Sequence, residues 1–345
     1  MFKSKKLVAG IIIFVSVMLA TLSFYFYQVA KAPNLQVDKE DRYLLIPTGA
    51  TYQTVIDSLK SSKILHDELS FSFLAKLLDY QEAVKPGKYL IKKNMGNREA
   101  LQMLRAGRQT PVKLTFNNIR LKNELAFKLC RYLEADSLQF KALLNTTPVV
   151  TQYGFDTTTI MCMFLPNTYE FFWNTSAQQL LDRMNREYTK FWTEERKQKA
   201  ASINFTPIQV SILASIVEAE QARKNDEKPR VAGLYINRLK ENMPLQADPT
   251  LVFALKNFSL KRILKGHMQL ESPYNTYKYT GLPPGPINLP TLASINAVLN
   301  YEKHDYLYMC AKEDFSGYHN FADNFEDHLK NARLYQKALN AANIR

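Results

Sequence analysis

The first hydrophobic feature of the chain is an uncharged stretch at residues 7–30. Residues 7–27 alone are long enough to cross a hydrocarbon core of about 30 Å as a helix. Three lysines lie in the first six residues, and Tyr25 and Tyr27 lie at the far end of the stretch. Because positive residues stay on the cytoplasmic side of a bilayer and aromatic residues line its surfaces, the N-terminus is expected in the cytoplasm.

A cleaved signal peptide is the competing interpretation of this stretch. Ala30-Lys31-Ala32 resembles a small-residue cleavage site. However, Pro33 follows that site directly, and the apolar stretch is long for a signal peptide. The sequence therefore favours an uncleaved anchor, with the rest of the chain outside the cytoplasmic membrane.

The polar residues that follow predict a linker and then a small α+β unit. A strand is expected at 43–47 and another at 89–91, and three amphipathic helices are expected beside them. Thr51, Asp67 and Asn97 stand where these helices begin, and their side chains are favoured at the N-cap. Gly107 follows the third helix, where a glycine commonly ends one.

A larger α+β region begins near Asn117, and the segment 243–279 is read as irregular. Gly281–Pro286 must be a stiff loop because it holds three prolines among six residues. The predicted elements of this region are helices at 121–134, 177–191, 210–220, 231–239, 292–299 and after Phe325, and a strand at 306–311. The predicted organisation is a cytoplasmic tail (1–6), a transmembrane helix (7–27), a linker (28–41), a small module (42–110) and a larger domain (111–345).

Glu218 stands out because the helix predicted at 210–220 is otherwise apolar or small until its last turn. Its helical neighbours carry no positive charge, so we expect burial to raise the pKa of its carboxyl. Such a group holds a proton near neutral pH and donates it, as a general acid must. Glu220 differs, because Arg223 and Lys224 follow at the spacing of helical salt bridges. An ordinary surface role for Glu218 stays open at this point.

The formal charge of +13 raises the question of an anionic partner. The anchor places the domain away from nucleic acid, and the basic residues are scattered, so no nucleic acid is expected. Anionic lipid headgroups or a carboxylate-bearing polymer of the envelope fit better, and general surface solvation fits equally well. No phosphate-binding glycine loop and no Cys/His cluster is evident, so neither a cofactor nor a metal is expected.

Four blocks of the sequence stand out: LASIVEAE at 213–220, VAGLYINRL at 231–239 with MPLQADPT at 243–250, SPYNTY at 272–277 with GLPPGPI at 281–287, and GYHNF at 317–321 with His328 after it. Together, in this order, they resemble the YceG-like family of endolytic murein transglycosylases. The resemblance implies an α+β protein whose module at 42–110 is LysM-like and whose catalytic domain follows. It also implies single-pass anchoring in the inner membrane, with the catalytic domain in the periplasm.

The resemblance further implies a reaction on peptidoglycan glycan strands. The β-1,4 bond after N-acetylmuramic acid is cut, and the muramyl 6-hydroxyl attacks its own C1 to leave a 1,6-anhydro end. Glu218 matches the family's catalytic glutamate. Because the nucleophile is internal, one glutamate can act as acid and then as base. Peptidoglycan synthases of the elongation or division machinery are the protein partners that this activity suggests.

The other candidate site residues come from the same four blocks. Gln246 and Asn275 are candidates for holding acetamido groups or orienting Glu218. Asp248 is a candidate for stabilising an oxocarbenium ion or capping a helix, and Arg238 for contacting a lactyl or peptide carboxylate. The remaining candidates for substrate-binding or supporting roles are Glu220, Asn237, Thr250, Tyr274, Thr276, Tyr277 and His319. Sugar stacking by the two tyrosines and simple core packing both stay open.

Two alternatives to lytic cleavage remain open from the sequence. A muramidase-type hydrolase would use Glu218 as acid and Asp248 as base, since ordinary glycosidases need two carboxylates. A non-catalytic scaffold would bind the cell wall without cutting it. The masses of the products distinguish the two enzymes, and the absence of products indicates the scaffold.

Overall fold

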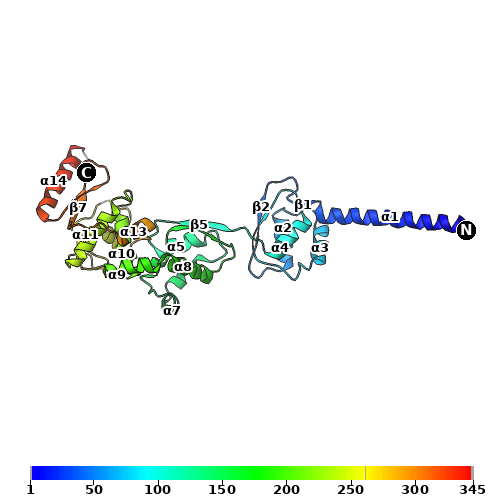
Figure 1. Ribbon diagram of the computed structural model, residues 1–345, viewed down its shortest axis with the longest axis horizontal. Helices are drawn as coiled ribbons and strands as arrows, with labels where there is room; N and C mark the ends of the chain where they lie inside the picture. Colours follow the sequence, from blue (N-terminus) through cyan, green and yellow to red (C-terminus); the bar gives the residue numbers. More distant parts are fainter. Residues whose placement is uncertain (1, 261, 343–345) are drawn as a thin grey trace. The chain divides into compact units, whose positions relative to one another are not determined.

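The computed structural model describes residues 2–260 and 262–342 as two compact units (Figure 1). Unit 1 consists of Met1–Lys113, Tyr132–Glu134 and Glu170–Thr175. Unit 2 consists of Leu114–Arg131, Ala135–Tyr169 and Ser176–Arg345. Both contain helices and strands, so the fold class is mixed α+β.

The first helix, α1 (Phe2–Lys31), contains a span that is long and apolar enough to cross a membrane. That span is Lys5–Lys31, its mean hydropathy is 2.5, and nothing in the structure buries its most apolar part. Among the described residues no other single helix passes the same test. The predicted anchor therefore lies on a continuous helix, which extends beyond residue 27 at its C-terminal end.

The expected linker at 28–41 is partly wrong. Val29 and Ala30 belong to the last turns of α1 and lie in the core of unit 1. The strand β1 (Pro33–Leu35) then pairs with β4 (Met95–Gly96), and Leu35 is fully buried. The linker was predicted from the polar composition of this segment, but the polar side chain of Asn34 makes hydrogen bonds inside the protein.

Asn34 and Asn97 form the centre of a buried polar network in unit 1. Asn34 Nδ2 donates to Asn97 Oδ1 at 2.7 Å, and Asn97 Nδ2 donates to the carbonyl of Val29 at 2.9 Å. The backbone N–H of Asp67 donates to Asn34 Oδ1 at 2.6 Å. These bonds join the end of α1 to α3 and α4, because buried polar groups must find partners inside the protein.

Unit 1 otherwise follows the predicted strand and helix pattern. Its main elements are β2 (Arg42–Ile46), α2 (Tyr52–Ser61), α3 (Glu68–Leu77), β3 (Gly87–Ile91) and α4 (Asn97–Ala106). β2 and β3 pair antiparallel. Thr51 and Asp67 cap α2 and α3 as predicted, and Gly107 ends α4 with a φ of 70°, a left-handed conformation that suits glycine. The cap expected at Asn97 is wrong, because Gly96 is the N-cap of α4 and the Asn97 side chain belongs to the buried network. The LysM-like character of this unit stays a prediction.

Unit 2 is mostly helical, with short strand pairs. Its helices are α5 (Lys122–Cys130), α6 (Ser137–Leu144), α7 (Thr147–Thr151), α8 (Ala177–Phe191), α9 (Glu194–Ser202), α10 (Pro207–Glu220), α11 (Lys228–Lys240), α12 (Asp248–Leu255), α13 (Leu292–Leu299) and α14 (Phe325–Ala341), with 3-10 turns η1 (Ile160–Met163) and η2 (His267–Gln269). Its strands β7 (Tyr308–Ala311) and β8 (His319–Ala322) pair with each other. The strands β5 (Val112–Phe116) and β6 (Asn167–Phe171) also pair, and the residues of each are divided between the two units.

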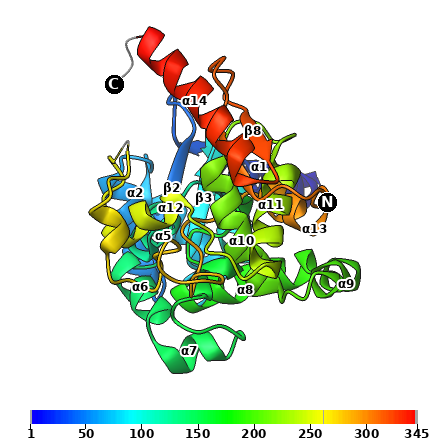
Figure 2. The same ribbon diagram turned by 90° about the vertical axis from the view of Figure 1, so that its left-hand side faces the viewer.

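The centre of unit 2 is α10, which lies among α11, α12 and α13 (Figure 2). Every residue of α10 from Val210 to Val217 is buried. A helix that is apolar all round is expected to be buried on all sides. The chain therefore surrounds the middle of α10, and only its two ends are partly exposed, residues 207–209 at the start and residues 218–220 at the end.

Two sequence predictions for unit 2 were wrong in extent. The helix expected at 121–134 ends at Cys130, and the segment 243–279 is not wholly irregular because α12 lies inside it. Pro249 stands in the first turn of α12, where a proline is tolerated because its missing N–H would have no helical partner. The other helices predicted for this unit were confirmed within a few residues.

Replacing Asn97 with alanine should destabilise unit 1. Asn97→Ala leaves the carbonyl of Val29 without its donor, so we expect a loss of about 1–3 kcal/mol in unfolding free energy. Hydrogen exchange of peptides from residues 28–110 measures this loss. Gln53→Ala, an exposed helical change, should alter the same exchange by less than about 0.5 kcal/mol. Equal exchange in the two variants would contradict the role of the network.

Candidate active site

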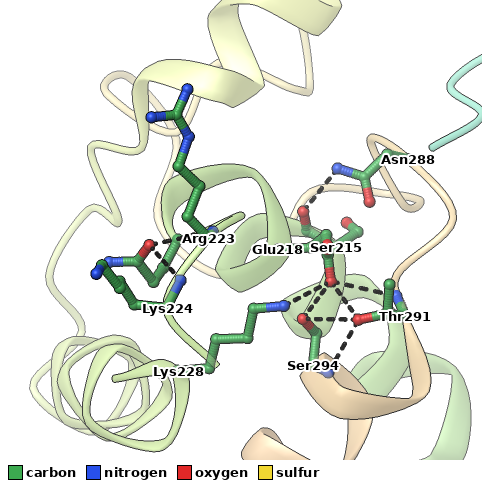
Figure 3. Close-up of polar contacts among 9 residues, drawn as sticks. Ser215, Glu218, Arg223, Lys224, Lys228, Asn288, Thr291 and Ser294 are labelled. Atoms are coloured by element: carbon green, nitrogen blue, oxygen red, sulfur yellow. Dashed lines mark hydrogen bonds and ion pairs between the residues drawn. The ribbon is translucent and has the colours of Figure 1, made fainter. Parts of the chain in front are cut away.

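Glu218 lies on the last turn of α10, and its side chain is 18 % exposed. Three side chains converge on its Oε2 atom (Figure 3). Lys228 Nζ donates at 3.0 Å, Thr291 Oγ1 at 2.5 Å and Ser294 Oγ at 2.5 Å. The backbone N–H of Thr291 adds a fourth donor at 3.3 Å. The carboxylate is therefore fixed in position through one of its two oxygens.

The donors come from the starts of two helices. Lys228 is the first residue of α11 and is almost fully buried, with a side-chain exposure of 1 %. Thr291 is the N-cap of α13, and Ser294 stands three residues later. Helix N-termini favour negative charge because their first N–H groups have no helical partner. Glu218 therefore faces the positive ends of α11 and α13 as well as a lysine.

The loop 281–288 is held against α10 one turn before Glu218. Ser215 Oγ accepts from the backbone N–H of Ile287 at 3.0 Å, and Asn288 Nδ2 donates to the carbonyl of Ser215 at 3.0 Å. Figure 3 shows Asn288 approaching Ser215 on one side of Glu218. The proline-rich loop thus leads directly into Thr291, which it places at the carboxylate.

The expected raised pKa of Glu218 is wrong. Burial does act to raise it, but hydrogen bonds from Ser294, Thr291 and Lys228, with the lysine's charge, hold the pKa of Glu218 below its ordinary value of 4.5. The cation was missed because it comes from α11, ten residues away, and not from the helix that carries Glu218. In the substrate-free protein this carboxyl is therefore ionised near neutral pH.

Glu220 takes the opposite state. Burial raises its pKa from 4.5 to about 7, and the charge of Asp248 acts in the same direction. Its Oε1 accepts from Tyr235 Oη at 3.0 Å. The expected pairing with Arg223 and Lys224 is wrong: α10 ends at Glu220, so the helical spacing does not continue to these residues, and among the described residues the hydrogen-bond partner of Glu220 is Tyr235.

A cavity of about 580 Å³ opens at the end of α10, and we call it the catalytic cavity. Its wall includes Glu218, Glu220 and Asp248. Arg120 and Asn288 also line it. Three carboxyl groups in one cavity of this size provide groups that can hold, donate and accept protons beside a bound ligand.

A second cavity of about 330 Å³ shares Glu220 and Asp248 with the first. Arg238 and Gln246 line this Arg238 cavity, and Arg238 Nη2 donates to Gln246 Oε1 at 2.8 Å. Tyr277 also lines it, and its hydroxyl donates to Asp248. Six of the predicted site residues, these five and His319, therefore line this cavity, and Glu220 and Asp248 are shared by the two cavities.

Three predicted residues support this wall from inside the protein. Asn275 is fully buried, and its amide donates to the carbonyls of Met268 and Leu270. Thr250 and Thr276 share a hydrogen bond of 2.8 Å between their hydroxyls, and both are buried. Their polar groups are used within the loop and α12, so they shape the cavity wall.

The remaining predicted residues do not line the cavity that contains Glu218. Asn237 Nδ2 donates to the carbonyl of His304 at 2.6 Å, and Tyr274 packs against Phe253 with ring centroids 4.8 Å apart. His319 lines the Arg238 cavity, and its Nδ1 lies 2.8 Å from Glu227 Oε2. Glu227, which is 4 % exposed, was missed by the sequence analysis.

Lys228, Thr291 and Ser294 were also missed. Thr291 and Ser294 carry a readable signal, because a threonine directly before an apolar helical run is a typical N-cap. Lys228 carries no such signal, since a lysine before a proline at a helix start is usually solvated. Only the folded chain brings its amine to Glu218.

The sequence model of the YceG-like family matches residues 44–334, which is most of the chain. The chain belongs to the YceG-like family. The four blocks quoted above all lie within the matched range, so the resemblance read from them is confirmed at the level of the family.

Relatives within the YceG-like family are named endolytic murein transglycosylases. One from Streptococcus pneumoniae is 27 % identical, over 95 % of this chain, but this chain covers only 64 % of that relative's length. One from Bacillus subtilis is 28 % identical, over 86 % of this chain and 85 % of the relative. The crystal structure of a yceG-like protein from Listeria monocytogenes matches with a TM-score of 0.56 and 25 % identity, over 84 % of this chain and 98 % of that one.

Removing the Lys228 amine should raise the pKa of Glu218. Lys228→Met deletes both a hydrogen bond and a positive charge, and both favour the ionised carboxyl. The measurement is a pH titration of the Glu218 carboxyl carbon by NMR. Lys224→Met serves as the control, since the Lys224 amine lies over the Tyr318 ring. A titration unchanged in Lys228→Met would contradict the contact.

The Glu220 carboxyl should make folding less favourable as the pH rises from about 4.5 to about 7. In that range the unfolded chain loses its proton while the folded chain keeps it, so stability falls with pH. Glu220→Gln does not titrate and keeps an acceptor for Tyr235. We therefore expect its melting temperature, minus that of the unchanged protein, to increase across this pH range. A difference that is constant with pH would refute the raised pKa.

Proposed function

We propose that this protein is a membrane-anchored endolytic transglycosylase that cuts peptidoglycan glycan strands. The observation that carries the proposal is the geometry of Glu218. A single glutamate at the end of a buried helix faces a cavity of about 580 Å³, and one of its oxygens is fixed by three side chains. Membership of the YceG-like family and relatives named endolytic murein transglycosylases supply the substrate class.

In the proposed reaction Glu218 first donates a proton and later receives one back. The protonated carboxyl gives its proton to the bridging O4 of N-acetylglucosamine as the bond from muramyl C1 to that oxygen breaks. The muramyl 6-hydroxyl then forms a bond to C1, and its proton passes to the Glu218 carboxylate. Glu218 ends as it began, no water is consumed, and the new end is 1,6-anhydro.

Because the pKa of Glu218 is low in the absence of a ligand, substrate binding has to raise it before Glu218 can act as an acid. A sugar that covers the catalytic cavity removes the remaining water from this partly exposed carboxyl. Loss of water raises the pKa of a carboxyl, and burial is already the largest influence on Glu218. Binding of the strand therefore favours uptake of the proton that cleavage needs, and the ionised form is ready for the second step.

A hydrolase is the second candidate, and the position of Asp248 is the observation that favours it. Asp248 lines the same cavity as Glu218, as the second carboxyl of a glycosidase would. In that reaction Asp248 takes a proton from water, and the product gains one water. In either reaction α1 crosses the inner membrane, the N-terminus is cytoplasmic, and the catalytic domain is periplasmic. The module at 42–110 acts as a LysM-like glycan binder or as a spacer.

Glu218→Gln should abolish cleavage while the protein stays folded. Gln keeps an oxygen for Lys228 and Thr291 but has no proton to transfer, so we expect a rate loss of at least about 100-fold. Mass spectrometry of digested peptidoglycan measures the products, and Glu302→Gln, at a glutamate paired with Arg230, is the control.

The product masses distinguish the lytic enzyme, the hydrolase and the wall-binding scaffold. Fragments with 1,6-anhydro ends that appear with the unchanged protein and with Glu302→Gln, but not with Glu218→Gln, support the lytic reaction. Fragments heavier by one water indicate the hydrolase. If the unchanged protein binds the strands and never cuts them, the protein is a wall-binding scaffold.

A further inference from the structure

Arg238 is a buried cation whose observed partners are neutral. It is 7 % exposed. Nη1 donates to the carbonyl of Leu245 at 3.0 Å, and Nη2 donates to the amide oxygen of Gln246 at 2.8 Å. Its Nε is buried and has no hydrogen-bond partner. In the part of the chain that the structure describes, neither of its hydrogen bonds goes to a carboxylate.

An arginine in this state is costly to the folded protein. Buried charges are normally paired, because losing water without gaining a partner is unfavourable. Burial lowers the pKa of Arg238 from its ordinary value. The ring of Tyr308, with its centroid 5.5 Å from the guanidinium carbon, offers partial compensation through its electron-rich face. Arg238 therefore still lacks an anionic partner among the described residues.

His328 presents a second unpaired nitrogen to the same cavity. It lies on the first turns of α14, and its ring stacks on Tyr308 with centroids 5.3 Å apart. Its Nδ1 is buried and has no hydrogen-bond partner. Burial and the charge of Arg238 lower the pKa of His328, so the ring is a neutral group held beside a cation. An anion in the cavity would accept hydrogen bonds from both residues.

The two acidic residues that line the Arg238 cavity are not ion-pair partners of Arg238. Glu220 accepts from Tyr235, and Asp248 accepts from Tyr277. Both also line the catalytic cavity, so the two cavities adjoin at these residues. The Arg238 cavity is therefore a polar side chamber that adjoins the place where the glycan would be cut.

We propose that the Arg238 cavity is a subsite for a carboxylate carried by the side branch of the muramyl sugar. This inference rests on the proposed function, because the substrate class comes from it. Arginine matches a carboxylate with two parallel hydrogen bonds, and its free Nε supplies one of them. The carboxylate belongs to the stem peptide on intact strands and to the lactyl group on strands without stems.

The test measures binding separately from cleavage. The full-length protein carrying Glu218→Gln is mixed in detergent with short fluorescent glycan strands, and the Kd is read from fluorescence anisotropy. The strands carry stem peptides or have had them removed. Each kind is used with free carboxylates and with the carboxylates converted to neutral methylamides.

Neutralising the carboxylates should weaken binding about tenfold to 100-fold, as expected for a charge-assisted hydrogen bond to a buried group. Arg238→Gln should abolish this difference, and His328→Gln should reduce it. Arg230→Gln removes the same charge from an arginine already paired with Glu302, and it should keep the difference. Because the difference is taken within each variant, a general loss of stability does not imitate it.

The outcomes separate the inference from the proposed function. An Arg238-dependent difference only on strands with stems assigns the stem carboxylate, and one only on strands without stems assigns the lactyl group. Equal binding of charged and neutral strands overturns the inference, whether or not the unmodified protein cleaves. A clear Arg238-dependent difference without cleavage supports the inference and overturns the proposed reaction. Failure of all strands to bind overturns both.

Discussion

The contact between Lys228 and Glu218 determines how the site is built. It places a positive charge from the start of α11 beside a carboxyl at the end of α10, and α13 adds two hydroxyl donors to the same oxygen. One oxygen is fixed, and the side chain is 18 % exposed towards the catalytic cavity. Three helices must therefore be packed correctly before the carboxyl has a defined position and charge.

Glu218 and Glu220 illustrate how environment assigns roles to identical side chains. They are two residues apart and line the same cavity, yet one is ionised near neutral pH and the pKa of the other is about 7. The difference comes from their partners, a lysine with two hydroxyls for Glu218 and a tyrosine for Glu220. Carboxyls with separated pKa values in one cavity are typical of sites that move protons.

The sequence predicted those features that depend on local pattern. The caps at Thr51 and Asp67, the C-terminal glycine at 107 and the helices α8, α10, α11 and α13 follow from periodicity and capping, and these were found. The pKa of Glu218 could not be predicted, because the decisive charge lies on another helix. The buried strand near Leu35 was missed because its neighbour Asn34 looks solvated but is satisfied internally.

The junction between α1 and unit 1 has a mechanical consequence. The helix does not end in a flexible tether, since Val29 and Ala30 lie in the core of unit 1 and Asn97 binds the carbonyl of Val29. A helix is stiff over this length, so any tilt of α1 is also a tilt of unit 1. With α1 embedded in a bilayer, the thickness of the bilayer and the angle of the helix would set the direction in which unit 1 points. The bilayer would then determine the orientation of unit 1 through α1.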